Sequence, residues 1–379
     1  MFLVVLGMQA MSFAHAGQPA GSTSTQSMLR AEGRWIFDES GNVVILHGAN
    51  FFGYEYGLWS SHAEADYRRM ASWGFNVVRL PIAWSFIEPR AMKYDASYFT
   101  KYVDRDIAWA KKYGLYIVLD MHQYAWSPRF TYIHRAAGIP AWAQTRYPNT
   151  GEGEARAKAD FWNNLGPNGT PPSASNPSMQ DRLILAWMYV AKRYAGEKTI
   201  AGYDLFNEPD TTRCSCTKVC YLDESRFVDM VATFQARLVD RIRKVDGKHM
   251  ILWEPGTWEF GQHTSYLTRA NVVYSPHYPG WGKGNSIYAY ADKSWLEASV
   301  NAIVGLSERW NQPVFMGEWG ICVEAANATQ YIRDLTDLQD RYLISWTWWS
   351  YGREDGFGML LLDQNGVERT ALTSMLVRP

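Results

Sequence analysis

Eight short apolar segments, most of them separated by amphipathic helical patterns, constrain the fold of this chain more than any other feature. The segments read as buried strands and lie at residues 43–48, 76–80, 116–120, 202–206, 249–253, 272–276, 314–317 and 343–348. Helical patterns lie at 99–110, 180–195, 225–245, 293–309 and 329–340, and the capping-box pair Ser61 and Glu64 predicts another helix, which stops at Gly74. This alternation predicts an α/β fold, a single (β/α)8 TIM barrel. No glycine-rich nucleotide fingerprint follows a strand, which disfavours an open doubly wound sheet.

Two of these segments lead directly into a glutamate. Residues 203–206 are followed by Asn207 and Glu208, and residues 313–317 are followed by Glu318. Because the carboxyl ends of parallel barrel strands open on one face, the two carboxyls can meet across that face. Partial burial raises the pKa of a glutamate and suits it to donate a proton near neutral pH. The pattern therefore indicates a pair of catalytic carboxyls.

A Glu-Pro pair is weak evidence by itself, because it is more often a capping acid in a loop between a strand and a helix. Glu88 and Glu254 also precede a proline. Glu254 ends the strand-like segment 249–253, so it competes with Glu208 for the role of the acid.

Aromatic residues are more abundant than a core requires. The chain of 379 residues has 18 Trp and 23 Tyr, and flat amphipathic rings at a surface suit ligands with one apolar face, such as sugars. A tryptophan-rich core accounts for part of this excess. The 37 basic and 38 acidic residues nearly balance, so the charge gives no reason to expect nucleic acid or an anionic membrane surface as a partner.

Further polar and aromatic side chains gather at the predicted strand ends, namely Arg79, His122, His277, Tyr278 and Trp349. A metal site would use the two histidines and an acid, but these lack close ligand spacing, and an arginine at the same rim opposes a cation. A Ser-His-Asp site would need a nucleophile elbow, which is absent from the sequence. We therefore expect no metal and no other cofactor.

This set of strand ends resembles glycoside hydrolase family 5, the cellulase-fold retaining β-glycosidases. Asn-Glu-Pro after the fourth strand and Gly-Glu-x-Gly after the seventh carry the resemblance, together with the other strand-end residues. The resemblance implies Glu208 as the acid/base and Glu318 as the nucleophile. It also implies Arg79 and Tyr278 near the nucleophile, Asn207 on the substrate 2-hydroxyl, His122 and His277 lining the site, and Trp349 under the reacting sugar. Taken singly, these residues could equally be a barrel-mouth ion pair, core imidazoles and core packing.

One departure from the family concerns Tyr278. The family usually has His-x-Tyr after the sixth strand, whereas His277 and Tyr278 are adjacent here. Either a local backbone shift lets Tyr278 reach the nucleophile, or Tyr274 or another hydroxyl takes that role. The runs 119–123 and 138–143 look like the endoglycoceramidase-type branch of the family.

The four cysteines are predicted to lie at the same rim. Cys214, Cys216 and Cys220 follow Glu208, and Cys322 follows Glu318. In an exported protein disulfides are the default, with three possible pairings, and a zinc clip made of all four thiolates is the alternative.

The first residues resemble an export signal. Residues 1–16 combine an apolar run with a small-x-small ending, although they lack a basic start, so we predict a signal peptide and a secreted or periplasmic protein. Residues 17–28 are predicted to be a disordered linker and 29–379 the catalytic domain. No later apolar run reaches the length of a membrane span, and we expect a monomer.

Three functions remain open from the sequence. The first is a retaining endo-β-glycosidase that hydrolyses β-linked glucan chains or oligosaccharides through two glutamates. The second is an endoglycoceramidase-like hydrolase of glycosphingolipids, which would need an apolar slot beside the site. The third is a carbohydrate-binding barrel without catalysis, against which the two strand-end glutamates count.

Overall fold

A barrel of eight parallel strands forms the centre of the protein. The computed structural model describes residues 26–123, 126–131, 137–210, 226–255, 266–352 and 357–377. The barrel strands are β3 (His47–Phe51), β4 (Val77–Ile82), β5 (Tyr116–Met121), β6 (Ile200–Asp204), β7 (Met250–Trp253), β8 (Val272–Tyr274), β9 (Phe315–Trp319) and β10 (Ser345–Tyr351). Each predicted strand is present with its ends shifted by a few residues.

The strands lie in the order β8-β7-β6-β5-β4-β3-β10-β9, and every neighbouring pair in this sheet is parallel. The sheet closes between β8 and β9 through two isolated bridges, Tyr274 with Val314 and His277 with Glu318. At this seam the backbone N–H of Tyr278 donates to the carbonyl of Glu318 at 2.8 Å. The prediction of a single (β/α)8 barrel is therefore confirmed.

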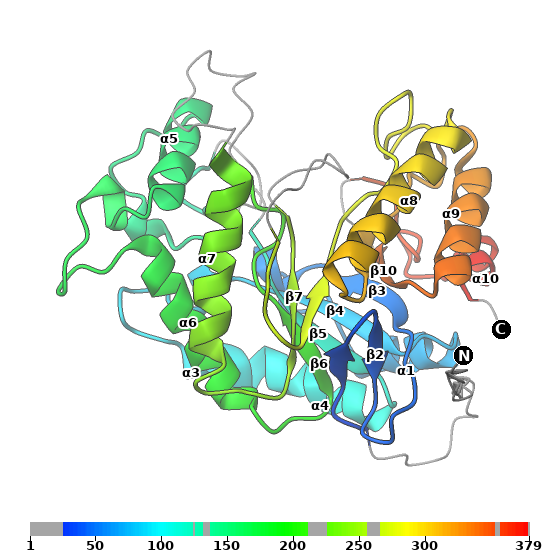
Figure 1. Ribbon diagram of the computed structural model, residues 1–379, viewed down its shortest axis with the longest axis horizontal. Helices are drawn as coiled ribbons and strands as arrows, with labels where there is room; N and C mark the ends of the chain where they lie inside the picture. Colours follow the sequence, from blue (N-terminus) through cyan, green and yellow to red (C-terminus); the bar gives the residue numbers. More distant parts are fainter. Residues whose placement is uncertain are drawn as a thin grey trace, which may run out of the picture.

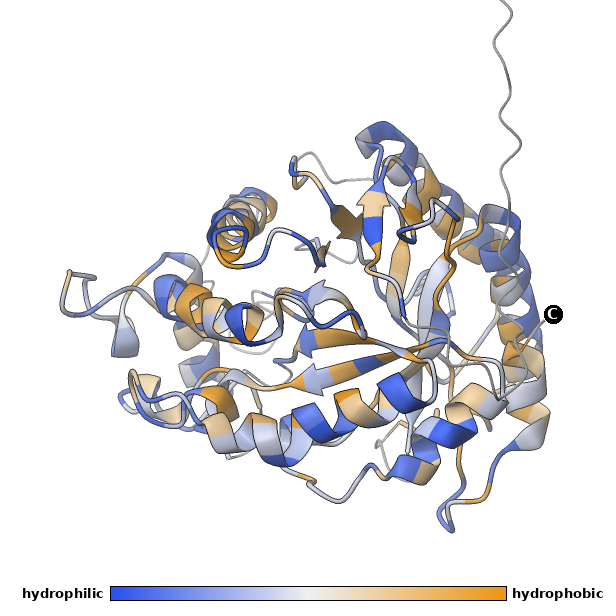
Figure 2. Ribbon diagram, turned by 90° about the horizontal axis from the view of Figure 1, so that it is seen from below, coloured by the Kyte–Doolittle hydropathy of each residue, from blue (hydrophilic) through white to orange (hydrophobic). Residues whose placement is uncertain are grey.

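Helices surround the barrel and bury one face each. They are α1 (Glu64–Ser72), α2 (Trp84–Ile87), α3 (Ala96–Tyr98), α4 (Asp104–Lys112), α5 (Gly151–Trp162), α6 (Met179–Tyr194), α7 (Phe227–Ile242), α8 (Lys293–Trp310), α9 (Ala328–Tyr342) and α10 (Thr370–Leu376). In α7 the buried residues Val231, Phe234, Leu238 and Ile242 recur at the spacing of one helix face. Figure 1 shows α6 and α7 on one side of the barrel and α8 and α9 on the other, and Figure 2 shows hydrophobic beside hydrophilic segments along the helices.

The start of α1 corrects one expectation. The predicted cap Ser61 lies two residues too early, because the helix begins at Glu64 and its N-cap is Ala63. The backbone N–H of Ala63 donates to Asp66 Oδ2 at 2.8 Å, so the aspartate provides a hydrogen-bond acceptor for the N-cap backbone. The Ser61 hydroxyl is buried and makes no hydrogen bond within the part of the chain that the structure describes.

A short hairpin, which the sequence analysis did not predict, covers the amino-terminal end of the barrel. Strands β1 (Arg30–Glu32) and β2 (Trp35–Phe37) pair antiparallel. Leu29 and Ile36 are buried in one cluster with barrel residues from Leu46 to Phe315. The hairpin therefore closes the barrel at the end opposite the carboxyl ends of the strands.

The long insertion after β5 contains α5, which packs beside the segment that follows Glu208. Lys158 Nζ lies 2.7 Å from Asp210 Oδ2, and Trp162 Nε1 donates to the Asp210 carbonyl at 3.0 Å. The insertion therefore holds the chain two residues beyond one of the predicted catalytic carboxyls.

The described residues begin inside the predicted linker. Gln26 Nε2 donates to the carbonyl of Leu115 at 2.6 Å, and the side chains of Ser27 and Glu39 are also hydrogen-bonded, so residues 26–28 contact the domain. The predicted signal peptide 1–16 lies outside the described residues, and export and a monomeric state stay predictions. Among the helices that the structure describes, none is long and apolar enough to cross a membrane.

We predict an acid-sensitive contribution to stability near the amino-terminal end of the barrel. Asp246 Oδ2 accepts hydrogen bonds from Tyr203 at 2.8 Å and from His249 at 2.5 Å. Burial acts to raise the pKa of Asp246, but the bonds from His249 and its neighbours outweigh burial and lower the pKa to about 2. A carboxyl with a lowered folded-state pKa stabilises the fold above its unfolded pKa, and this stabilisation is lost as pH falls from about 4 to 2.

Asp246→Asn should therefore lower the free energy of unfolding by about 1–2 kcal/mol at pH 7 and by much less near pH 2.5, as measured by urea denaturation. Asp240→Asn is the control, because Asp240 forms an exposed ion pair with Arg269, and such pairs contribute little. An equal loss for Asp246→Asn at both pH values would contradict this account.

Candidate active site

A fully buried arginine organises the carboxyl end of the barrel. Arg79 of β4 donates from Nη1 to Glu318 Oε1 at 2.7 Å and to Asn50 Oδ1 at 3.0 Å. Its Nη2 donates to Asn207 Oδ1 at 3.0 Å, and its Nε donates to Asp204 Oδ2 at 3.0 Å. One side chain thus joins the ends of four barrel strands.

Two more acids lie close to the same guanidinium. Arg79 Nη2 lies 3.1 Å from Asp120 Oδ1 and 3.5 Å from Glu254 Oε1. Burial raises the pKa of Asp204 to about 7, although Arg79 opposes the shift. The arginine stays charged because the surrounding acids raise its pKa despite its complete burial. Removing one partner of such a network leaves an uncompensated buried charge, which costs about 3–5 kcal/mol.

Glu208 and Glu318 face each other across the barrel mouth. One carboxylate oxygen of each, with a ring nitrogen of His277, all lie within 4.8 Å of one another. Glu318 is the penultimate residue of β9 and its side chain is 4 % exposed, whereas the side chain of Glu208 is 15 % exposed. The structure therefore brings together the two carboxyls that the sequence singled out, with Glu208 the more accessible.

The surroundings of the two carboxyls differ. Burial raises the pKa of Glu208 well above its usual range, and the charge of Glu318 raises it further. Burial also raises the pKa of Glu318, but Arg79, His122 and the Tyr278 hydroxyl act against that rise. Since Arg79 and Tyr278 bond to Glu318, a single proton shared by the pair resides on Glu208.

Tyr278 reaches Glu318 even though the usual spacer residue is missing. Its hydroxyl donates to Glu318 Oε2 at 3.1 Å, and its φ of +44° lies in the left-handed region. Tyr274 does not substitute for it, because its ring packs between Trp253 and Trp310 and its buried hydroxyl makes no hydrogen bond among the described residues. Of the two possibilities left open by the sequence, the local backbone shift is the one present.

The two predicted histidines differ in charge. His122 Nδ1 lies 2.7 Å from Asp120 Oδ2, and although burial acts against it, the charge of Asp120 raises the pKa of His122 to about 9. Burial and the nearby charge of Arg79 lower the pKa of His277 well below its usual value. The structure thus places a charged imidazole near Glu318 and a neutral one against Glu208.

Glycine at position 317 lets His277 lie against β9. A Cβ at Gly317 would be 2.6 Å from His277 Nε2, so a larger residue would displace the ring. His277 Nδ1 lies 3.1 Å from Glu208 Oε1 in this position. The missing side chain at position 317 thus allows the imidazole to approach the strand beside Glu318.

Asn207 and Trp349 are both buried beside the charged residues of the site. Asn207 Nδ2 is buried and makes no hydrogen bond within the described parts of the chain, so an amide donor remains free. Trp349 stacks on His122 with ring centroids 5.6 Å apart and an interplanar angle of 17°. Both residues thus belong to the cluster predicted from the sequence.

Sequence reasoning missed Asn50, Asp120 and Asp204 and treated Glu254 only as a competitor. A charged residue inside an apolar strand is the signal that was available for the two aspartates, because such residues are rarely buried without a partner. Asp204, Glu254 and His277 form one set close enough to ligate a cation, and Glu208, His277 and Glu318 form another. Arg79 already forms ion pairs with three of these acids, namely Asp204, Glu254 and Glu318.

The predicted cysteine cluster is only partly described. Cys322 is half-buried and has no disulfide partner among the described residues. Cys214, Cys216 and Cys220 lie outside the described residues, so the disulfides and the alternative zinc clip stay predictions.

The chain is similar in sequence to a family of glycoside hydrolases and to several of its members. The family model Cellulase (glycosyl hydrolase family 5) matches residues 37–355. The endoglycoceramidase of Cyanea nozakii is 26 % identical over 62 % of this chain and 50 % of its own length. Endoglucanase B of Acetivibrio thermocellus is 25 % identical over 92 % of this chain and 68 % of its own length. The chain thus spans about half the length of the endoglycoceramidases of Cyanea nozakii and Hydra vulgaris that it matches.

Solved structures show the same fold. An endogalactoceramidase structure is similar with a TM-score of 0.75 and 24 % identity, covering 93 % of this chain and 85 % of that one. Endo-glycoceramidase II from Rhodococcus sp. is similar with a TM-score of 0.75 and 24 % identity, covering 90 % of this chain and 80 % of that one.

We predict that Tyr278→Phe raises the pKa of the Glu318 carboxyl by about half a unit to one unit, because the ionised carboxylate loses a donor. Carbon NMR of protein labelled at the glutamate carboxyl would follow this titration, with the Glu318 signal assigned by its loss in Glu318→Gln. Tyr274→Phe is the matched control and should leave the titration unchanged. Equal shifts in the two variants would show that the hydroxyl at position 278 has no special contact with Glu318.

Proposed function

The chain belongs to glycosyl hydrolase family 5, and from this premise we propose that it hydrolyses β-glycosides with retention of anomeric configuration. The observation that carries the proposal is the short separation of Glu208 and Glu318, whose nearest carboxylate oxygens lie within 4.8 Å. Retaining glycosidases hold their two carboxyls about 5–5.5 Å apart, whereas inverting enzymes leave about 6.5–9.5 Å for a water molecule. The arrangement therefore favours direct attack by one carboxylate.

In the first step Glu318 attacks and Glu208 protonates. An oxygen of Glu318 forms a bond to the anomeric carbon while the glycosidic bond breaks, and the leaving oxygen takes the proton of Glu208. Arg79 and Tyr278 bond to different oxygens of Glu318, at 2.7 Å and 3.1 Å, and so orient it for attack. The raised pKa of Glu208 keeps its proton available until the leaving group needs it.

In the second step the roles reverse. Glu208, now a carboxylate, takes a proton from a water molecule, and the water oxygen displaces Glu318 from the anomeric carbon. The free Nδ2 of Asn207 is suited to donate to the sugar 2-hydroxyl, a bond that strengthens in the oxocarbenium-like transition state. The face of Trp349 is suited to lie beneath the reacting sugar.

A β-glucan chain is the first candidate substrate. Tyr278 stacks on Trp281 with ring centroids 4.4 Å apart, and Trp281 is 39 % exposed. Trp295 Nε1 donates to the Trp281 carbonyl at 2.9 Å, so a second exposed indole lies close by. These rings extend from the residue that contacts Glu318 toward solvent, as a platform for a further sugar requires.

A glycosphingolipid is the second candidate. It is favoured by the similarity to endoglycoceramidases in both sequence and fold. The two candidates share the chemistry at Glu208 and Glu318. They differ in the leaving group, which is a sugar hydroxyl for the glucan and a lipid hydroxyl for the glycosphingolipid. Membership of the family and the paired carboxyls argue against the third possibility, a barrel that binds carbohydrate without hydrolysing it.

We predict that proton NMR of the first-formed sugar from a β-linked substrate shows the β-anomer, because two displacements restore the original configuration. Glu208→Ala should lose substrates that need a protonated leaving group, keep activity on an activated aryl β-glycoside, and form a β-glycosyl azide when azide is added. Glu318→Gln should fold and lose turnover on both kinds of substrate. An α-anomer as the first product would overturn the double displacement.

Two assays separate the substrate candidates. One measures release of reducing ends from barley glucan, carboxymethylcellulose and mannan, and the other measures release of glycan from a glycosphingolipid in detergent. We expect Trp281→Ala to lower kcat/KM on long glucans by about tenfold, from the loss of one stacking contact, and to leave activity on an activated aryl monoglycoside largely intact. Activity on the glycolipid alone would replace the first candidate by the second.

A further inference from the structure

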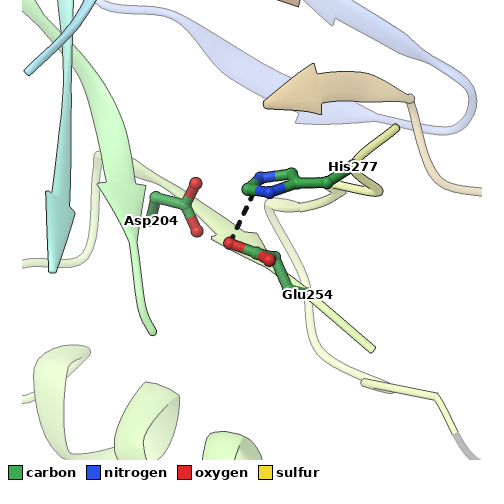
Figure 3. Close-up of side chains that lie close together, drawn as sticks. All are labelled: Asp204, Glu254 and His277. Atoms are coloured by element: carbon green, nitrogen blue, oxygen red, sulfur yellow. Dashed lines mark ion pairs between the residues drawn. The ribbon is translucent and has the colours of Figure 1, made fainter. Parts of the chain in front are cut away.

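Glu254 contacts the backbone of Glu208 and the side chains of His277 and Arg79. It follows β7 and is 3 % exposed. Its Oε2 accepts a hydrogen bond from the backbone N–H of Glu208 at 2.8 Å, and its Oε1 lies 3.4 Å from His277 Nε2 and 3.5 Å from Arg79 Nη2. Figure 3 shows the side chains of Asp204, Glu254 and His277 converging, with a dashed line along the 3.4 Å contact between Glu254 and His277.

This position makes Glu254 a poor competitor for proton donation to substrate. Both of its oxygens already face protein groups, and its side chain is 4 % exposed, compared with 15 % for Glu208. Glu208 is thus the carboxyl of the two that a leaving group can approach.

The backbone of Glu208 needs support. Its φ of +46° is unfavourable for any residue with a side chain, and the following Pro209 further restricts it. Two side chains hold this turn, since Gln123 Nε2 donates to the Glu208 carbonyl at 2.9 Å and Glu254 accepts from its N–H. Glu254 is itself anchored from α7, because Gln235 Nε2 donates to its carbonyl at 2.6 Å.

We propose that Glu254 is a positioning residue for the acid, whose carboxyl fixes the backbone turn at Glu208, and with it the place of the Glu208 side chain, by accepting the Glu208 N–H. The imidazole lies between the two carboxyls: Nδ1 is hydrogen-bonded to Glu208 Oε1 at 3.1 Å, whereas Nε2, 3.4 Å from Glu254 Oε1, makes no hydrogen bond among the described residues. This inference rests on the proposed role of Glu208 as the proton donor.

Burial and the neighbouring acids favour the neutral form of Glu254. Burial raises its pKa well above the usual range, the charge of Asp204 raises it further, and Arg79 opposes both. Asp120 and Glu208 also raise it, and His277 faces it as a neutral ring. A neutral carboxyl accepts the Glu208 N–H without adding a negative charge beside Glu208, and the side-chain amide of glutamine can do the same.

The first test compares Glu254→Gln with Glu254→Leu. Leucine removes the acceptor, so kcat/KM on a β-glycoside with a poor leaving group should fall by about 10- to 100-fold, with little loss on a 2,4-dinitrophenyl β-glycoside, which needs no protonation. Glutamine keeps an oxygen acceptor and should recover most of that loss. Equal losses in both variants, or a loss that does not depend on the leaving group, would overturn the proposal.

Glu88→Leu is the matched control. Glu88 is another fully buried acid before a proline, it accepts a backbone N–H, from Met92 at 2.6 Å, and burial raises its pKa. Its loss should lower stability without a dependence on the leaving group. If Glu254→Leu fails to fold, Glu254→Ala takes its place in the same comparison.

A second measurement does not need turnover. In carbon NMR of labelled glutamate carboxyls, assigned with Glu208→Gln, the pKa of Glu208 should fall by about one unit or more in Glu254→Leu, because its carboxyl moves away from Glu318, and should change little in Glu254→Gln. Equal falls in both variants would mean that Glu254 acts through charge and not through position. If the wild-type protein cleaves no β-glycoside, the proposed function fails, and this titration still decides the role of Glu254.

Discussion

The carboxyl end of the barrel depends on one buried positive charge. Arg79 contacts Asp120, Asp204, Glu254 and Glu318 while excluded from solvent, so its guanidinium offsets the cost of burying negative charge on these acids. The arginine depends on the acids in turn, because burying an unpaired guanidinium would cost more free energy than burying it in ion pairs. Burial raises the pKa values of Asp204, Glu208 and Glu254, and the charges of neighbouring acids raise them further, which favours retention of protons in the site. A proton donor can therefore exist beside a nucleophile, as the proposed hydrolysis requires.

The place where the barrel closes is also the place where the site is built. Strands β8 and β9 meet only through isolated bridges, one of which joins His277 to Glu318. A regular ladder would continue the alternation of side chains in and out of the barrel, whereas the left-handed backbone at Tyr278 turns both His277 and Tyr278 toward the centre. Irregular pairing at the seam thus brings two neighbouring residues to Glu208 and Glu318, which explains why no spacer is needed between them.

Much of this arrangement can be predicted from the sequence, because strand ends are local features. The apolar runs before Glu208 and Glu318 place both residues at the carboxyl ends of strands, and the common direction of the strands brings them together. The meeting of Asp120 and Asp204 on Arg79 could not be predicted in this way, since it depends on the register of strands that are far apart in sequence. The hairpin that contains Ile36 and the cap of α1 at Ala63 were missed because their contacts, rather than their local patterns, define them.

The hairpin at the start of the domain sets the order in which this protein can be completed. Leu29 and Ile36 are buried in one cluster with Phe315, and the backbone N–H of Ala31 donates to Asn271 Oδ1 at 2.7 Å, so the hairpin relies on segments that are synthesised long after it. During synthesis the docking surface of the hairpin is incomplete until β8 and β9 have emerged. The long sequence separation of these contacts makes their formation slow compared with that of the local helix and strand pairs. Closure of the barrel floor is therefore a late step of vectorial folding, and until then the apolar interior of the barrel is open at its amino-terminal end.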